Sequence, residues 1–444
     1  MSPRRLILLT LAVLLLAVVL LAGIAHWSDL RAGERDFFHA ADAPTLSESI
    51  DPGLITRGEY LAKLGDCGAC HSTPGNPPFS GGLKMALPIG AIYTTNITPD
   101  KTYGIGGFTL ADFDRALRVG VANGHSLYPA MPFASYAIVT AEDVKALYAY
   151  FELGVTPASV PNKKSDILFP LSMRWPLTYW RLAFAPKPKP FDGKTFTDEA
   201  VARGAYFVEG LGHCGECHTP RGVALQVKAQ NGRDGDEFLR GGPVENWYAP
   251  SLRNGGPDTI GEWSEMQISE FLQSGANRTG IAFGSMSDVI VHSTQFLSAE
   301  DSAATAKYLK TLQDPPIDGR ARFAYDDRTD RELASGDARK RGALLYLDNC
   351  AACHRPDGRG YEGVFPSLAG NPVVEADNPL SLVSVVLLGS KTSRTSTTPA
   401  QFAMPAFAWR LTDQDAADII SFIRGSWGND AKPIEARKVA ALRK

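Results

Sequence analysis

The arrangement of the cysteines constrains this chain more than any other feature of its sequence. The 444 residues contain six cysteines, and every one lies in a Cys-x-x-Cys-His motif: CGACH, CGECH or CAACH. In this motif two thiols bond to one porphyrin, and the adjacent histidine ligates its iron, so the spacing is typical of covalent haem attachment. The cysteines predicted to hold haem are Cys67, Cys70, Cys214, Cys217, Cys350 and Cys353.

Two other uses of paired cysteines fit the sequence less well. A thioredoxin-like site needs a single C-x-x-C near a βαβ pattern, whereas this chain repeats the motif three times. Structural zinc sites usually combine two such pairs, which an odd number of pairs does not allow. We therefore expect three covalently bound haem c groups, with one axial iron ligand each from His71, His218 and His354.

The second axial ligand decides what such a haem can do. A methionine gives His/Met ligation and a raised potential suited to electron transfer, whereas an open face suits catalysis. The predicted ligands are Met131, Met286 and Met404, each of which lies between its haem motif and the closing helix of its repeat. Met85, Met173 and Met266 fit a packing role better. His125 is the best alternative ligand, although a loop histidine is the commoner interpretation.

The chain contains three copies of one unit. Each copy opens with Arg-Gly about ten residues before the haem motif, at Arg57, Arg203 and Arg341. Each closes with a helix that starts at a Ser or Thr followed three residues later by an acid, at Thr140, Ser298 and Thr412. The glycines of the Arg-Gly pairs, Gly58, Gly204 and Gly342, are predicted to let the opening and closing helices approach closely.

Few stretches alternate between apolar and polar residues, so the predicted fold class is all-α with long loops. Further helices are expected at 109–119, 264–273 and 378–388. Composition places three domains at 45–160, 190–315 and 335–430, joined by proline-bearing linkers at 154–193 and 313–336. The aromatic segment WPLTYWRLAF in the first linker is expected to pack between domains or against a partner. Backbone carbonyls near Pro366, at 249–252 and at 96–99 are candidate acceptors for the three motif histidines.

Residues 1–28 form a membrane anchor or a signal segment. Leu6 to Ala25 carry no charge, and as a helix they span about 30 Å, the thickness of the hydrocarbon layer. Arg4 and Arg5 precede the segment, which favours a cytoplasmic amino end. A cleaved signal is the alternative, but its apolar core is usually shorter, so we favour an uncleaved anchor. Both interpretations export the rest of the chain.

The net charge of −3 and the lack of a long basic tract argue against nucleic-acid binding. Several segments resemble one family: GEYLAKLGDCGACHS, YTTNITPD, LYPAMPF, HCGECHTPRG, WYAPSLRN, GSMSDVIVHSTQFLS and NCAACHRPDGRG. The chain is similar to the triheme cytochrome c subunits of membrane-bound bacterial alcohol, gluconate, sorbitol, fructose and aldehyde dehydrogenases. The resemblance covers nearly all of the chain from about residue 50.

The resemblance implies three tandem class I cytochrome c domains behind one transmembrane helix. It further implies an electron carrier, not an enzyme, that passes electrons from a separate catalytic subunit to ubiquinone or an oxidase. The location would be the inner membrane, with the haem domains on the periplasmic side. The N-terminal anchor departs from the alcohol dehydrogenase members, in which attachment elsewhere is expected. The alternative function is a multihaem peroxidase or reductase with one open haem.

Overall fold

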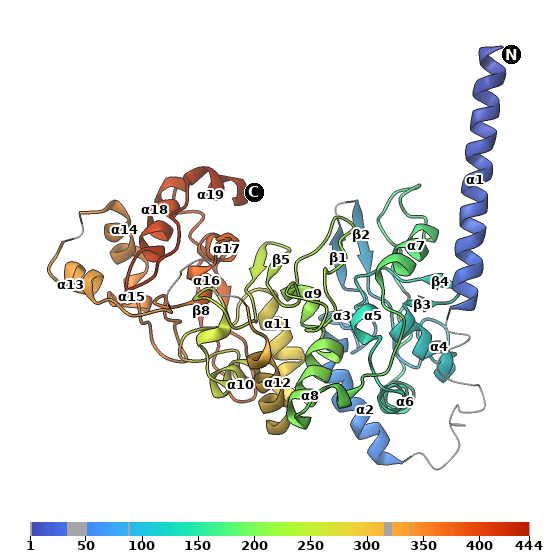
Figure 1. Ribbon diagram of the computed structural model, residues 1–444, viewed down its shortest axis with the longest axis horizontal. Helices are drawn as coiled ribbons and strands as arrows, with labels where there is room; N and C mark the ends of the chain where they lie inside the picture. Colours follow the sequence, from blue (N-terminus) through green and yellow to red (C-terminus); the bar gives the residue numbers. More distant parts are fainter. Residues whose placement is uncertain (1, 33–50, 88, 315–321, 338, 444) are drawn as a thin grey trace. The chain divides into compact units, whose positions relative to one another are not determined.

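The computed structural model describes residues 2–32, 51–87, 89–314, 322–337 and 339–443. The chain divides into two compact units, Met1–Asp192 and Gly193–Lys444 (Figure 1). Unit 1 contains the N-terminal helix and the first repeat, and unit 2 contains the second and third repeats. The predicted domain limits at residues 45 and 315 lie outside the described residues.

Unit 1 places its haem motif directly after an opening helix and ends its repeat with a closing helix. Its helices are α1 (Pro3–Arg31), α2 (Pro52–Leu64), α3 (Cys67–His71), α4 (Leu110–Asp114), the π-helical η2 (Arg115–Val119), α5 (Phe133–Tyr136), α6 (Ala141–Ala149), the π-helical η3 (Tyr150–Gly154) and α7 (Trp175–Phe184). Its strands are β1 (Lys84–Leu87), β2 (Gly90–Tyr93), β3 (Val121–Ala122) and β4 (His125–Ser126).

Unit 2 repeats this order twice. The second repeat comprises η4 (Gly193–Thr195), α8 (Glu199–Tyr206), the π-helical η5 (Phe207–Leu211), α9 (Gly215–His218), β5 (Gly242–Val244), β6 (Trp247–Ala249), η6 (Ile260–Glu262), α10 (Glu265–Ser274), α11 (Ser285–His292), η7 (Thr294–Phe296) and α12 (Ala299–Thr311). The third comprises α13 (Arg328–Ala334), α14 (Arg341–Asn349), α15 (Ala351–His354), α16 (Pro372–Glu375), α17 (Leu380–Leu388), β7 (Ser390–Lys391), β8 (Ala403–Met404), α18 (Asp413–Arg424) and α19 (Ala436–Leu442).

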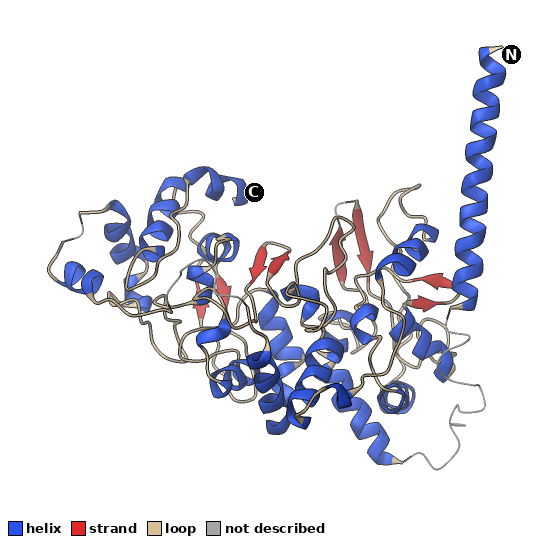
Figure 2. Ribbon diagram, viewed as in Figure 1, coloured by secondary structure: helices blue, strands red, loops and turns tan. Residues whose placement is uncertain are grey.

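The helix-rich character is as predicted, but the all-α expectation needs correction. Figure 2 shows short strands among the helices, and β1–β2, β3–β4, β5–β6 and β7–β8 pair as two-stranded antiparallel hairpins. None of these strands exceeds four residues. The pairing of such a short strand depends on the surrounding fold. The strand is also too short to show an alternation of apolar and polar residues in the sequence.

The predicted starts of the closing helices are confirmed. The hydroxyl of each capping residue accepts a hydrogen bond from the backbone N–H three residues later, in the pairs Thr140–Asp143, Ser298–Asp301 and Thr412–Asp415. These bonds satisfy an otherwise free N–H of the first turn, and the acid favours the positive end of the helix dipole. The helices expected at 109–119, 264–273 and 378–388 are also present, as α4 with η2, α10 and α17.

Each opening helix crosses its closing helix at the predicted glycine. A Cβ built on Gly58 would lie 1.9 Å from the carbonyl oxygen of Ala146, and one on Gly204 would lie 2.0 Å from that of Ala304. A Cβ on Gly342 would lie 2.3 Å from the carbonyl oxygen of Asp418. Only a residue without a side chain allows backbones to pack this closely.

The preceding arginine in each repeat pairs with the acid that starts the closing helix. Arg57 Nε donates to Asp143 Oδ1 at 2.7 Å, and Arg203 Nε donates to Asp301 Oδ1 at 2.5 Å. Arg341 donates to Asp415 through Nη2. Sequence analysis identified both partners in each repeat but did not connect them, because they are 74 to 98 residues apart in the chain.

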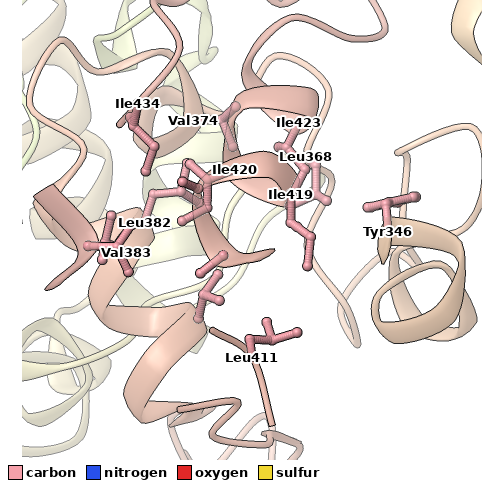
Figure 3. Close-up of a cluster of buried hydrophobic side chains, with 14 of the residues drawn as sticks. Tyr346, Leu368, Val374, Leu382, Val383, Leu411, Ile419, Ile420, Ile423 and Ile434 are labelled. Carbon is pink, nitrogen blue, oxygen red and sulfur yellow. The ribbon is translucent and has the colours of Figure 1, made fainter. Parts of the chain in front are cut away.

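The third repeat shows how the crossing helices enclose a core. Ile419, Ile420 and Ile423 of α18 pack with residues of α17 and with Tyr346 of α14 in one buried cluster (Figure 3). Tyr346 also contacts the rings of Phe422 and Trp427, with centroids 5.4 Å and 5.2 Å away. The haem motif of the repeat adjoins this core, because α15, which ends at the motif histidine, directly follows α14.

The N-terminal helix is tied to unit 1 by a buried polar cluster. The carboxylate of Asp29, which is 3% exposed, accepts hydrogen bonds from the Ser126 N–H and hydroxyl at 2.9 Å and from the Thr178 hydroxyl at 2.8 Å. Arg181 donates to the same carboxylate at 3.2 Å. The aromatic segment forms α7 and packs against α1, a contact that the expected packing between domains or against a partner did not include. Figure 1 shows α7 beside the end of α1 that carries Asp29.

Candidate haem-binding sites

The three motifs adopt the same local form, a single helical turn directly after the opening helix. The helical turns are α3, α9 and α15, and each ends at the motif histidine. A sharp change of chain direction accompanies each of them. Asp66 and His213, which precede the first cysteine in two repeats, have φ of 54° and 38°, and Arg355, which follows the third histidine, has φ of 63°. A non-glycine residue rarely adopts such angles, so the surrounding fold must impose them.

All three motif histidines bond to a backbone carbonyl through the same ring nitrogen. His71 Nδ1 lies 2.7 Å from the Thr95 oxygen, His218 Nδ1 lies 2.7 Å from the Pro250 oxygen, and His354 Nδ1 lies 3.0 Å from the Pro366 oxygen. A carbonyl can only accept, so Nδ1 carries the hydrogen and Nε2 keeps its lone pair. This is the tautomer and the orientation that an iron ligand needs.

The predicted acceptors are thus confirmed in two repeats and wrong in the first. Sequence reasoning expected the acceptor within 96–99, whereas the structure uses the carbonyl of Thr95. The side chain of Asn96 is occupied in a different way, since it donates to the carbonyl oxygens of Ala158 and Val160. The first repeat has no proline at this position, so the sequence offered no marker for the correct residue.

Burial favours neutral forms of the motif side chains. It lowers the pKa of His71, His218 and His354, which keeps the imidazoles unprotonated and able to donate a lone pair.

Burial also raises the pKa of the first cysteine of each motif, to about 12 for Cys67, Cys214 and Cys350. All six thiols are free of disulfide bonds. Such thiols are poor thiolate nucleophiles and fit covalent attachment to a cofactor better than a redox dithiol.

The three candidate methionine ligands occupy three different backbone settings. Met131 lies in a turn, where its N–H donates to Tyr128 and its carbonyl accepts from Phe133. Met286 is the second residue of helix α11, and Met404 lies in strand β8 opposite Ser390. Of the three, only Met131 therefore lies outside the helices and strands. All three side chains are partly buried, whereas Met266 is 69% exposed.

The alternative ligand His125 is placed away from such a role. It is an exposed residue of β4, and its ring lies 6.4 Å from the ring of His26 on α1. Among the described residues, no group of three or more His, Cys, Asp or Glu side chains is arranged to hold a metal ion.

A cavity of about 440 Å³ adjoins the third motif inside unit 2. It is lined by Arg355, which follows the motif histidine, by Arg359 and by Arg278 of the second repeat, with Tyr325 and Glu362. Arg359 lies over the Tyr325 ring at 3.9 Å. The guanidinium groups could neutralise carboxylates of a bound porphyrin, because arginine recognises carboxylates through paired N–H groups.

The described residues include one helix that is long and apolar enough to cross a membrane, α1. Its apolar side chains from Leu6 to Leu21 are largely exposed, unlike those of a core helix in a soluble protein.

Comparison with known proteins agrees with this geometry. The cytochrome c family matches residues 339–427, the third repeat. The gluconate 2-dehydrogenase cytochrome c subunit of Pantoea cypripedii is 49% identical over 407 residues, covering 90% of this chain and 92% of the relative. The alcohol dehydrogenase (quinone) cytochrome c subunit of Gluconacetobacter polyoxogenes is 48% identical over 91% of this chain and 87% of its own length. The fructose dehydrogenase cytochrome subunit of Gluconobacter japonicus is 36% identical over 90% and 84%.

Proposed function

This chain belongs to the family of dehydrogenase cytochrome c subunits, and we propose that it carries electrons from the catalytic subunit of a membrane-bound periplasmic dehydrogenase to ubiquinone or a terminal oxidase. The relatives named above are cytochrome subunits, which carry electrons and leave substrate oxidation to another subunit. The similarity extends over about nine-tenths of the chain, so the same division of labour supports the proposal here. The identity of the substrate is not part of it.

The observation that carries the proposal is the threefold repetition of one histidine arrangement. In each repeat the fold orients the motif imidazole by a carbonyl bond to Nδ1 and leaves Nε2 available. Haem, when bound, supplies one-electron redox chemistry. We assign three haems, held covalently by Cys67 with Cys70, Cys214 with Cys217, and Cys350 with Cys353. The axial pairs are His71 with Met131, His218 with Met286, and His354 with Met404.

The role of each side chain follows from its chemistry. The carbonyl bond to Nδ1 makes the imidazole a stronger electron donor and fixes its plane. A thioether opposite it raises the potential, because sulfur favours the reduced iron. His218 and His354 are buried and His71 is partly buried, which limits the access of water and also tunes the potential.

The N-terminal helix fits a retained anchor better than a cleaved signal. Asp29 lies beyond the apolar run, and its carboxylate is embedded in unit 1 through Ser126, Thr178 and Arg181. A cut after Ala25 would leave this buried cluster only four residues from a new chain end. Arg4 and Arg5 favour a cytoplasmic amino end, so the three repeats would lie on the periplasmic side of the inner membrane.

Counting haems tests the core of the proposal. The chain should be produced with a c-type maturation system, and haem per polypeptide measured by the absorbance of its pyridine complex. We expect three haems, and two in the variant Cys350→Ala with Cys353→Ala. The control His125→Gln should keep three, because His125 is exposed and outside the motifs. Fewer than three haems in the parent chain would refute the assignment.

Purification of the native complex tests the partner. A tag at the C-terminus should retain a larger dehydrogenase subunit from detergent-solubilised membranes, and substrate-driven reduction of a short-chain ubiquinone should require both subunits. Recovery of the chain alone, with peroxide-dependent turnover, would instead support an open haem and an enzyme of its own.

A further inference from the structure

Unit 1 exposes five large apolar side chains within residues 168–184, on α7 and in the loop before it, and α7 packs against α1. The loop before α7 carries Leu168 and Phe169, which are 79% and 80% exposed, and Leu171, which is also exposed. The outer side of α7 adds Leu182 and Phe184. We call these five residues the apolar rim. Water-facing loops seldom present so many large apolar side chains together, and such a surface usually marks an interaction site.

Two contacts fix the position of α7 along the axis of the N-terminal helix α1. Thr178 and Arg181 bond to Asp29, near the end of α1. The Tyr179 hydroxyl donates at 2.9 Å to the backbone carbonyl of Leu21, which lies eight residues, or about two helical turns, before Asp29 on α1. The helix α7 therefore lies alongside α1 from Leu21, near the end of the apolar run, to Asp29 beyond it, and cannot move along α1 without breaking the buried bonds to Asp29.

This position on α1 corresponds to the edge of the hydrocarbon layer of a bilayer. If Leu6 to Ala25 span the hydrocarbon layer, Leu21 lies four residues, or about 6 Å, inside its edge. Tyr179 must reach that depth, and α7 must lie in the layer between the acyl chains and the headgroups. The Trp175 ring lies 6.0 Å from that of Tyr179, and Trp27 stands on α1 between Leu21 and Asp29; aromatic side chains with a polar edge are favoured at this level.

The charges around the rim agree with a lipid surface. Exposed lysines flank it on both sides in the sequence, Lys163 and Lys164 before the loop and Lys187 and Lys189 after α7. The acidic residue at the edge, Asp166, accepts a hydrogen bond from the Tyr93 hydroxyl at 2.7 Å. Lysine ammonium groups beside an apolar face suit anionic headgroups.

We propose that the apolar rim inserts into the interfacial layer of the same bilayer leaflet that receives the end of α1, as a second membrane contact. This inference rests on the proposed function, because it takes α1 as a membrane-spanning anchor. Two contacts at different points would hold unit 1 in one orientation on the membrane, whereas a single helix would let it pivot. The rim thus fixes which face of unit 1 is presented to lipid-soluble acceptors.

Hydrogen exchange of the full chain in lipid nanodiscs tests the proposal. The nanodiscs should contain phosphatidylcholine with a fraction of phosphatidylglycerol. We expect the amides of residues 168–172 to exchange about tenfold or more slowly than those of residues 222–226, another loop with exposed apolar side chains, because insertion into lipid would keep water from the amides of the rim. The variant Leu168→Asp with Phe169→Asp should abolish this difference while the chain stays in the membrane fraction.

The matched control is Val223→Asp with Leu225→Asp, which replaces exposed apolar residues of unit 2 and should leave the exchange of 168–172 unchanged. Equal exchange of both loops in an anchored parent chain would overturn the inference and leave the anchor intact. Protection that arises only in the complex with the catalytic subunit would also overturn it, in favour of a protein contact. Release of the parent chain by alkaline carbonate would refute the anchor itself.

Discussion

Replacing Gly342 by alanine is the sharpest test of the helix crossing that holds each haem motif. The new Cβ would lie 2.3 Å from the carbonyl oxygen of Asp418 and 2.9 Å from the Cβ of Phe422. Backbone atoms cannot rotate away, so α14 and α18 would have to separate by about 1 Å to restore an ordinary contact. That movement would loosen the contacts of Tyr346, which is fully buried between these helices.

The expected cost follows from two opposing effects. Alanine favours a helix over glycine by about 1 kcal/mol. Overpacking against backbone costs typically 1–3 kcal/mol, and the severity of this overlap places it at about 3 kcal/mol. The net loss is therefore about 2 kcal/mol, which lowers the melting temperature of a domain of this size by roughly 8–16 °C.

The assay should report on the third repeat alone, because a chain of several domains does not unfold in one step. Hydrogen exchange of α14 and α18 in the haem-loaded protein meets this need, and protection there should fall by an amount equivalent to about 2 kcal/mol. Gly425→Ala is the matched control: the nearest atom to its Cβ is 3.7 Å away, so stability should change by less than about 0.5 kcal/mol. Equal effects of the two substitutions, or no effect of Gly342→Ala, would refute the packing argument.

Three further changes probe the ligands, the anchor and a buried carboxyl. Met404→Ala should lower the midpoint potential of one haem without preventing its attachment, whereas the exposed Met266→Ala should not; a redox titration with identical potentials would contradict the assignment. Asp29→Ala leaves Arg181 buried without its carboxylate, so the α1–α7 contact should weaken by about 3 kcal/mol; proteolysis and exchange at α7 measure this, and an unchanged pattern would show that the cluster is dispensable. Burial raises the pKa of Glu152 from 4.5 to about 7, so the folded state binds the proton more tightly than the unfolded state. Its contribution to stability is present below pH 4.5 and is lost as the pH rises through 7, and Glu152→Gln should remove this loss, worth about 1 kcal/mol after allowance for solvent screening. Urea unfolding at pH 5 and pH 8 would show whether the dependence flattens.

Several features could be predicted from sequence because they depend on residues that are close together in the chain. The caps at Thr140, Ser298 and Thr412 are three residues from their partners, so a short pattern suffices to find them. The glycines at the helix crossings could be predicted because each stands at a similar distance before its haem motif in all three repeats of the chain. Hairpins of two to four residues were missed, since no periodicity develops over such a length.

Other features depend on contacts across the chain. The choice of the Thr95 carbonyl as the partner of His71 could not be predicted, because only folding brings residues 24 positions apart to the same place. The arginine–aspartate pairs and the attachment of α7 to α1 through Asp29 have the same origin, with partners separated by up to 152 residues.

The sequence by itself determined the chemistry of this protein: thiol pairs and an adjacent histidine are joined by the covalent chain, so their spacing is fixed before folding begins. Tertiary structure decided how each imidazole is oriented, what backbone setting each methionine occupies, and where the N-terminal helix meets unit 1. Those outcomes depend on which distant groups share a buried volume, and only the packed fold settles that.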